Sequence, residues 1–345
     1  MPDGGQRKPL IIPIFIPNQG CPHRCAFCRQ EQITAQSSGT IDQSFVATTI
    51  ERALRSPRFD TGRKPQIAFY GGSFTRLPAG RMVELLAPVS PYIEKGLFDS
   101  VRVSTRPDAI DEERLRLLRH FGVTTVELGA QAMDDEVLSL SRRGHRAEDT
   151  VKASRLLKER GFTLAIQLMP GLPGDSKARW RKSIEDVIRL RPDMVRLYPT
   201  VVIRGTALAE WYLEKKYRPL GLREAVKACQ EGCIRFEDKG IPVIRLGLMA
   251  TPALLEHGQI LAGPWHNAFG HLVRSAVYHE RLEPSLPAIG FAKQVRLRAP
   301  ARDIPLLRGY QNRGLRLIEK RIGARITAVL PDETLDPGAI GVDRQ

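Results

Sequence analysis

Three of the chain's five cysteines lie in one short run, Cys21-Pro22-His23-Arg24-Cys25-Ala26-Phe27-Cys28, directly after the apolar residues 10–17. This C-x3-C-x2-C spacing offers three thiolates, one fewer than a structural zinc site or a fully ligated four-iron cluster requires. The pattern predicts an iron-sulfur cluster whose fourth iron is held by something other than cysteine. Two alternatives remain open. One is a zinc site completed by His23, whose position fits no usual zinc-finger spacing, and the other is a set of cysteines without a metal.

The cysteine run, with aromatic Phe27 before its last cysteine, resembles the cluster loop of the radical S-adenosylmethionine (SAM) enzymes. The resemblance implies that Cys21, Cys25 and Cys28 hold one [4Fe-4S] cluster. It also implies that the amino and carboxylate groups of SAM chelate the open iron, and that reduction of the cluster cleaves SAM to a 5′-deoxyadenosyl radical. An electron donor such as flavodoxin or ferredoxin is then required.

Composition places the chain among ordinary globular proteins, because 42% of its 345 residues are hydrophobic and 26% are charged. No apolar run approaches the ~20 residues that span a membrane, and residues 1–8 lack the apolar core of a signal peptide. Clustered cysteines in odd number suit a metal-binding protein in a reducing compartment. We therefore expect a cytoplasmic protein with no membrane partner.

The formal net charge of +15 is the second global signal. Such a charge favours a polyanionic partner, and RNA, specifically tRNA, is the partner that we expect. The alternative is a surface on which arginine is merely common.

From residue 10 to about residue 203, short β-rich runs alternate with helical patterns, which predicts βα units and a parallel sheet. We expect strands at 10–16, 66–70, 100–105, 124–128, 164–169 and 194–198, and helices at 45–55, 81–92, 112–121, 150–160 and 178–189. Six such units form an α/β fold, the partial (β/α)6 TIM-like barrel. Its active site is expected at the C-terminal ends of the strands.

The rest of the chain is expected to hold a helix at 221–239, a strand at 243–248, a loop-rich stretch at 251–287 and a strand-helix-strand pattern at 293–298, 304–322 and 325–330. We therefore predict a radical SAM barrel domain at 1–250 and a small basic α/β extension at 251–345. In the helix at 304–322, Arg313, Arg316 and Lys320 are expected on one side, opposite Leu307, Tyr310, Leu317 and Ile318. The basic side is either an RNA-binding face or simply solvated.

Motifs at the predicted strand ends extend the resemblance. The second strand ends at Gly71-Gly72-Ser73, where the family has Gly-Gly-Glu contacting the SAM amino group, so Ser73 replaces the glutamate. A Gly-Gly pair alone is also a common turn. The third strand ends at Ser104-Thr105-Arg106, whose hydroxyl and guanidinium suit ribose and carboxylate, although a surface arginine before a proline turn is the alternative for Arg106.

Gly129-Ala130-Gln131 and Arg143-Gly144-His145 resemble segments of oxygen-independent coproporphyrinogen dehydrogenase. By that resemblance, Gln131 contacts the SAM ribose and Arg143 contacts its carboxylate. Arg142 does not match the motif. Gln167 lies where the family packs a segment against adenine, and His145 is alternatively a helix C-terminal charge.

Residues 196–206 and 217–220 are similar to the catalytic subunit of Elongator, a modifier of the tRNA wobble uridine. This similarity implies a tRNA base as the substrate and places Tyr198, our candidate catalytic residue, on the substrate side. We expect the residues that follow the barrel in this sequence to be too few for the acetyltransferase-like domain of that subunit. The zinc-binding cysteine cluster of that subunit does not occur among the five cysteines given. Gln311-Asn312-Arg313-Gly314-Leu315 lacks the second glycine of an acetyl-CoA loop, and Cys229 and Cys233 are expected in a core.

Two other functions stay open at this point. One is radical chemistry on a small metabolite or tetrapyrrole, with the basic charge incidental. The other is a non-catalytic, cluster-containing RNA-binding protein.

Overall fold

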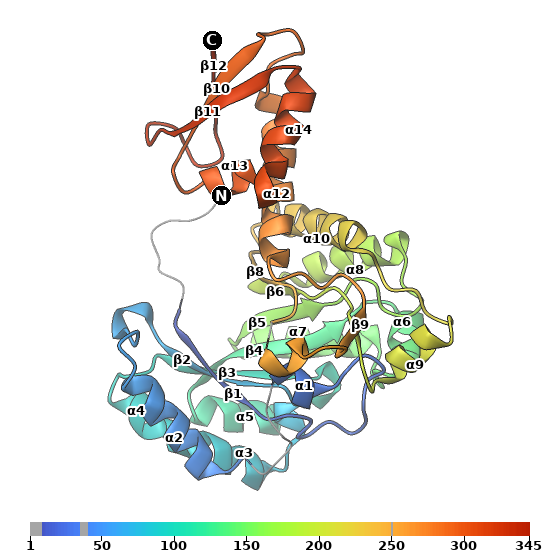
Figure 1. Cartoon of the computed structure of the whole chain (residues 1–345). Helices are drawn as coiled ribbons and strands as arrows, with labels where there is room; N and C mark the ends of the chain where they lie inside the picture. Colours follow the sequence, from blue (N-terminus) through green and yellow to red (C-terminus); the bar gives the residue numbers. More distant parts are fainter. Residues whose placement is uncertain (1–8, 35–40, 250) are drawn as a thin grey trace.

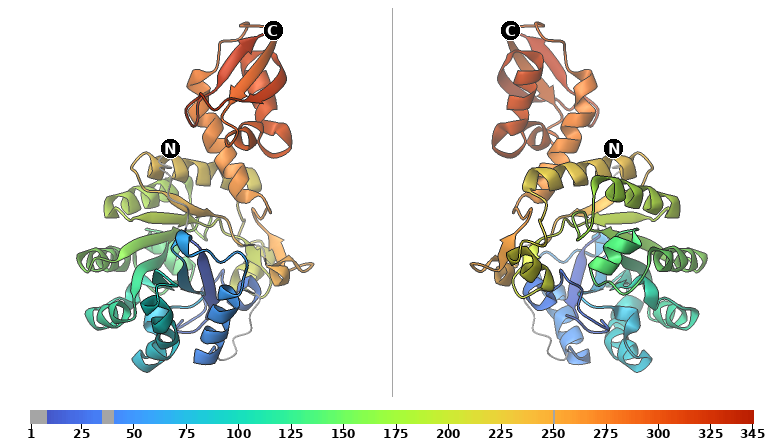
Figure 2. Two further views of the ribbon diagram at one scale, coloured as in Figure 1. Left: turned by 90° about the vertical axis from the view of Figure 1, so that its left-hand side faces the viewer. Right: turned by 90° about the vertical axis from the view of Figure 1, so that its right-hand side faces the viewer.

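The computed structural model describes residues 9–34, 41–249 and 251–345. Its centre is a seven-stranded parallel sheet that curls into an open barrel, with helices on the outer face (Figures 1 and 2). The strands are, in spatial order, β1 (Ile11–Phe15), β2 (Gln66–Tyr70), β3 (Ser100–Thr105), β4 (Val123–Gln131), β5 (Thr163–Leu168), β6 (Met194–Leu197) and β8 (Val243–Leu246). The predicted fold class is confirmed, and the predicted strand at 243–248 extends the same sheet.

Strand β3 illustrates why these segments pair. Val101 and Val103 are fully buried in the main hydrophobic core, whereas Arg102 and Ser104 line a cavity inside the barrel. Because side chains alternate across a strand, one face packs against helices while the other carries polar groups. The same alternation therefore places the apolar side chains of the strand in the core and its polar side chains in the cavity.

The outer helices are α2 (Gln43–Leu54), α3 (Ala79–Leu86), α4 (Ser90–Glu94), α5 (Glu112–His120), α7 (Ala147–Glu159), α8 (Lys177–Leu190) and α10 (Leu222–Glu237). Helix α5 begins at a typical N-cap, because the Asp111 carboxylate accepts a 2.9 Å hydrogen bond from the Arg114 amide. Leu115 and Leu118 bury its inner face. The single helix predicted at 81–92 is wrong: Pro88 and Pro91 remove backbone donors, and a short 3-10 turn separates α3 from α4.

Shorter elements surround the barrel mouth. They are α1 (Gln30–Thr34), α6 (Asp135–Leu140), α9 (Ala207–Leu213), α11 (Pro252–Leu255) and the antiparallel pair β7 (Val202–Ile203) and β9 (Ile260–Ala262). Residues 1–8, which we expected to lack a signal peptide, lie outside the described part of the chain.

Helix α12 (Phe269–Leu282) contradicts the expected loop-rich stretch at 251–287. Phe269, Val273 and Val277 belong to the barrel core, whereas Tyr278 and Leu282 belong to a second, separate core. Figure 1 shows α12 leading from the barrel into the C-terminal unit. One continuous helix thus connects the two hydrophobic cores.

The C-terminal unit contains a three-stranded sheet in the order β11 (Arg325–Pro331), β10 (Gln294–Ala299), β12 (Gly341–Arg344). The single helix predicted at 304–322 is broken into α13 (Ile304–Arg308) and α14 (Arg313–Ile322), because Gly309 adopts a positive φ of 64°. Leu317, expected on the apolar side of that helix, is 60% exposed; the buried face of α14 is Gly314, Ile318 and Ile322.

Within the described residues, no helix combines the length and apolar character that a membrane crossing requires.

Candidate functional site

The curled sheet encloses a cavity of about 940 Å³, and all seven strands contribute residues to its wall. The loops that follow the strands close one end. Every site residue that we predicted from the sequence lies on this wall: Cys21, Cys25, Cys28, Gly71, Gly72, Ser73, Ser104, Arg106, Gln131, Arg143, Gln167 and Tyr198. Segments up to 177 residues apart in sequence therefore meet in one cavity. This meeting is what we expect of residues at the C-terminal ends of neighbouring parallel strands.

The three clustered cysteines follow β1 and are half-buried at the cavity. The Cys28 amide donates to the Cys25 carbonyl (3.1 Å), which makes a tight turn within the cysteine run. Burial, reinforced by the charges of Cys25 and Cys21, raises the pKa of the Cys28 thiol to about 12. A bound cation is therefore what would bring these thiols to the thiolate form that ligates metal.

The zinc alternative is not supported by the geometry. His23 Nε2 lies 3.0 Å from the Arg143 carbonyl oxygen, to which it donates a hydrogen bond. Across residues 9–34, 41–249 and 251–345, no three His, Cys, Asp or Glu side chains gather closely enough for a single metal ion. Cys229 and Cys233 are fully buried in the barrel core, as expected.

The Gly71-Gly72-Ser73 turn packs directly against the cysteine loop. A side chain at Gly72 would place its Cβ 2.4 Å from the Gln19 carbonyl oxygen, so the close approach requires glycine. The Ser73 amide donates to the same carbonyl (2.9 Å), and the Ser73 hydroxyl is 3.5 Å from Cys21 Sγ. Because Ser73 is only 1% exposed and contacts the cysteine, its side chain supports the cluster loop.

Arg143 is held at the cavity wall by two hydrogen bonds. Nη1 donates to Cys25 Sγ (3.0 Å) and Nη2 donates to the Gly129 carbonyl (2.6 Å), while the buried Nε has no partner within the described chain. The neighbouring Arg142 instead lies over the Trp211 ring, 5.1 Å from its centroid. The two arginines therefore point to different places, as the motif suggested.

Gln131 and Gln167 lie side by side, with Gln167 Nε2 donating to Gln131 Oε1 (3.1 Å). Arg106 faces the cavity, but Asp108 binds its guanidinium through two hydrogen bonds of 2.8 and 3.0 Å. Asp108 thus balances the charge of Arg106, whereas Arg143 has no carboxylate partner among the described residues. Burial raises the pKa of Asp108, but the bonds to Arg106 outweigh it and hold that pKa below its usual range.

His145 is uncharged in this setting. Burial, together with the positive charges of Arg143 and Arg106, lowers its pKa to about 3. The alternative of a charged histidine at a helix C-terminus is therefore not supported.

Comparison with known proteins identifies the family of the chain. Residues 15–187 match the radical SAM superfamily, and residues 192–279 match the radical SAM C-terminal domain. The chain belongs to the radical SAM superfamily. The group implied by this family, a [4Fe-4S] cluster with SAM, fits the residues present, because three thiols line one cavity beside a glycine cradle and an unpartnered buried Arg143 Nε.

Individual relatives agree with the expected similarity to the Elongator catalytic subunit. A tRNA uridine(34) acetyltransferase from Methanocaldococcus infernus is 39% identical over 128 residues, which are 36% of this chain and 24% of that protein. Elongator complex protein 3 from Homo sapiens is 28% identical over 186 residues, 47% of this chain and 34% of that protein. The match thus spans only about a quarter to a third of these relatives.

A solved structure shows the same fold. An N-terminally truncated Elp3 from Methanocaldococcus infernus superimposes with a TM-score of 0.60 at 23% sequence identity, covering 81% of this chain and 63% of that one.

Sequence reasoning missed a charged layer inside the radical SAM barrel. Glu127 accepts hydrogen bonds from Arg102 (2.9 Å) and forms an ion pair with Arg196 (2.8 Å). Tyr70 donates to Glu127 (3.2 Å), and Arg196 Nη2 donates to the Tyr70 hydroxyl (2.8 Å). The sequence does carry a signal for this layer. Polar residues alternate with apolar ones in the strands, as in Arg196-Leu197-Tyr198, so Arg196 and Tyr198 lie on the same face.

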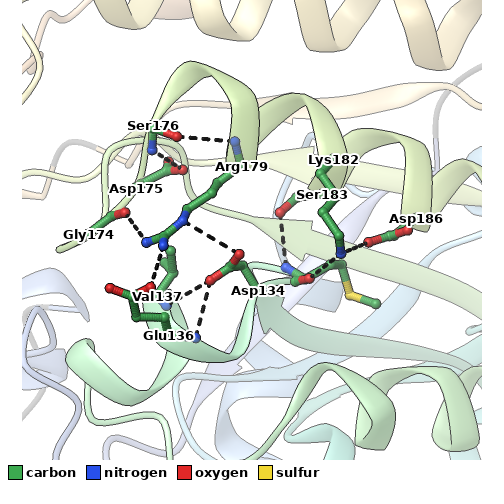
Figure 3. A network of polar contacts seen from close by, with 11 residues as sticks. Asp134, Glu136, Val137, Gly174, Asp175, Ser176, Arg179, Lys182, Ser183 and Asp186 are labelled. Atoms are coloured by element: carbon green, nitrogen blue, oxygen red, sulfur yellow. Dashed lines mark hydrogen bonds and ion pairs between the residues drawn. The ribbon is translucent and has the colours of Figure 1, made fainter.

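A network outside the radical SAM cavity fixes two of its loops (Figure 3). Arg179, on α8, donates to the Gly174 carbonyl (2.7 Å) and to Glu136, and pairs with Asp134 (3.6 Å). The Asp175 carboxylate accepts from the Gly171 and Ser176 amides, at 2.9 and 2.8 Å. The loops that follow Gln131 and Gln167 are thereby tied to one helix.

Proposed function

We propose that the chain binds one [4Fe-4S] cluster through Cys21, Cys25 and Cys28, cleaves SAM reductively, and uses the resulting radical to modify a base of tRNA. A ferredoxin or flavodoxin would supply the electron. The observation that carries the proposal is the meeting of three thiols, a glycine turn and Arg143 on one cavity in a chain of this family. The cofactor supplies the 5′-deoxyadenosyl radical, and the protein orients it and excludes water.

We assign each group of SAM to residues whose chemistry suits it. The backbone of Gly71, Gly72 and Ser73 would receive the SAM amino group, because a glycine cradle admits close approach. Arg143 would bind the carboxylate with its free Nε, and Arg106 would add positive charge nearby. The remaining contacts, to ribose and adenine, are assigned to Ser104, Gln131 and Gln167.

Tyr198 is proposed to act on the substrate side. Its hydroxyl lies 3.4 Å from Arg196 Nη1, and burial, opposed by the charge of Arg196, raises its pKa. A tyrosine that stays protonated at neutral pH donates a hydrogen bond, so Tyr198 would orient a substrate group near the radical.

The tRNA substrate is supported by the relatives' names and by charge. One matched relative is named tRNA uridine(34) acetyltransferase and another is named Elongator complex protein 3, and the chain carries a net charge of +15. On α14, Arg313, Arg316 and Lys320 are exposed opposite the buried Gly314, Ile318 and Ile322. We propose that residues 1–250 perform the radical chemistry and that the basic extension at 251–345 holds the tRNA.

Mass spectrometry of tRNA nucleosides tests this proposal. A strain that lacks the gene should lose one modified nucleoside and regain it when the wild-type gene is returned, but not when a Cys21→Ala, Cys25→Ala, Cys28→Ala gene is returned. An unchanged nucleoside profile would overturn the tRNA substrate. SAM cleavage by the purified protein would then still decide whether it is a radical SAM enzyme.

A further inference from the structure

We propose that Arg245 and Arg196, with the Tyr198 hydroxyl, form a binding site for the oxyanion, carboxylate or phosphate, of a small organic co-substrate. The site lies on the last two strands of the sheet, β6 and β8, whereas the cysteine loop follows the first strand. None of its three residues is among the positions assigned to SAM, and Tyr198 is the residue that we propose to act on the substrate side.

Strand register brings the two arginines together. Arg196 on β6 is the direct partner of Arg245 on β8 in the parallel pairing, and both side chains line the cavity. Like charges at paired positions of neighbouring strands repel and are destabilising. A negative charge between or beside the two guanidinium groups would relieve that repulsion.

The described residues supply only part of that negative charge. Glu127 is shared between Arg102 and Arg196, so one carboxylate balances two buried guanidinium groups. Arg245 makes no ion pair or side-chain hydrogen bond within the described residues, although its charge acts on Tyr198. Arg245 is exposed and solvated, so its charge remains available to an anion that enters the cavity.

Other acids near the cavity are already occupied. Glu237 forms ion pairs with Arg274 and Arg281, and Asp108 is bound by Arg106. Glu127 and Glu237 are the acids among the described residues that line the cavity, so no further carboxylate of the lining is placed to pair with Arg245. An anionic ligand would supply such a partner.

Buried N–H donors without acceptors also favour an anion in this part of the cavity. The Nε atoms of Arg102 and Arg196 are buried and have no hydrogen-bond partner within the described chain. Buried donors without acceptors are unfavourable, and guanidinium groups match the planar or tetrahedral oxygens of carboxylate and phosphate.

The cavity is also large for a small-molecule pocket. Its volume of about 940 Å³ is near the upper end of the roughly 300–1,000 Å³ typical of small-molecule pockets. The inference rests on the proposed function only for calling the ligand a co-substrate; the anion site itself follows from the charges and donors described above.

Calorimetry on the full chain tests the site. The protein is reconstituted anaerobically with its cluster left oxidised, so that SAM is not consumed, and is saturated with SAM to fill the contacts assigned to Arg143. Malonate, inorganic phosphate and the neutral malonamide are titrated separately at constant ionic strength. We expect malonate or phosphate to bind at one site per chain, and malonamide not to bind.

Arg245→Gln should weaken that binding by at least about tenfold, as expected for the loss of a charge-assisted hydrogen bond, and Arg245→Lys should weaken it less. The matched control is Arg223→Gln, which removes an exposed arginine from the outer helix α10 and should leave binding unchanged. A stronger response to malonate or to phosphate identifies the source of the oxyanion.

Failure of both anions to bind, or equal binding by wild type and Arg245→Gln, would overturn the site. Iron content and SAM affinity, measured on the same samples, report separately on the proposed function. A protein with its cluster and with SAM bound, but without an anion site, would refute this inference alone.

Discussion

The Arg143 guanidinium donates a hydrogen bond to Cys25 Sγ across 3.0 Å, joining the segment after α6 to the cysteine loop after β1. The same guanidinium donates to the Gly129 carbonyl at the end of the barrel. One arginine thus connects the sulfur ligands that we assign to the cluster with the strand end that we assign to SAM. Its position explains why two segments 118 residues apart belong to one site.

Arg143→Ala should weaken SAM binding by about 1.5–3 kcal/mol, because the SAM carboxylate would lose a charge-assisted partner. Arg142→Ala is the matched control, since Arg142 lies over Trp211 instead. Equilibrium dialysis with labelled SAM on cluster-containing protein measures both. A larger loss in Arg142→Ala than in Arg143→Ala would show that our assignment is shifted by one residue.

Gly72→Ala should displace the cysteine loop, since the new Cβ would lie 2.4 Å from the Gln19 carbonyl oxygen and 2.8 Å from that of Ile16. We expect a loss of about 1–3 kcal/mol in unfolding free energy and a lower iron content. Gly80→Ala is the control, because nothing lies within 4 Å of its added Cβ and alanine favours helix α3. Normal iron loading in Gly72→Ala would mean that the loop tolerates the shift.

His145 should make the protein less stable at mildly acidic pH. Its folded pKa of about 3 is below the ordinary 6.5, so the unfolded chain takes up a proton first as the pH falls. The contribution of neutral His145 to the free energy of unfolding is fully present above about pH 6.5. It falls at lower pH, and the loss reaches about 2 kcal/mol at pH 5. Denaturant unfolding of His145→Asn should show a smaller loss between pH 7 and pH 5, whereas exposed His120→Asn should match wild type. Identical pH dependence in all three proteins would contradict a buried neutral His145.

The basic face of α14 should determine how tRNA binding depends on salt. Changing Arg313, Arg316 and Lys320 to Gln should reduce the slope of log K against log salt by up to ~0.9 for each duplex contact, or ~0.7 for single-stranded RNA. A control with equal charge loss changes the exposed Arg52, Arg58 and Lys95 on the barrel. Equal slopes in the two triple variants would show that α14 is merely solvated. Unfolding free energy should change by no more than about 0.5 kcal/mol, because all three side chains are exposed.

Local sequence was sufficient for the strands and for the residues that follow them. The two-residue alternation of a strand is visible in runs such as Val101-Arg102-Val103. Residues that follow parallel strands meet at one edge of the sheet, so their proximity could also be predicted. The family resemblance supplied the roles assigned to those residues, which only experiments on ligands and substrates can test.

Helix α12 was not predictable because its local preferences oppose a helix. It contains Gly270 and the β-branched Val273 and Val277, which have low helix propensity. Burial against two cores stabilises it instead, together with a hydrogen bond from Gln230 Nε2 on α10 to the Ala276 carbonyl (2.9 Å). The charged layer around Glu127 was missed for a related reason: the partners of Glu127 come from three other strands and meet it only in the folded barrel.

Reductive SAM cleavage by the anaerobically reconstituted protein tests the central claim most directly. With dithionite, the wild type should bind about four iron atoms and form 5′-deoxyadenosine, and replacing Cys21, Cys25 and Cys28 with Ala should abolish both. The Cys229→Ala, Cys233→Ala double variant should keep both, because these thiols lie in the barrel core. Loss of the cluster in that double variant, or 5′-deoxyadenosine formation by the triple variant, would contradict the assignment.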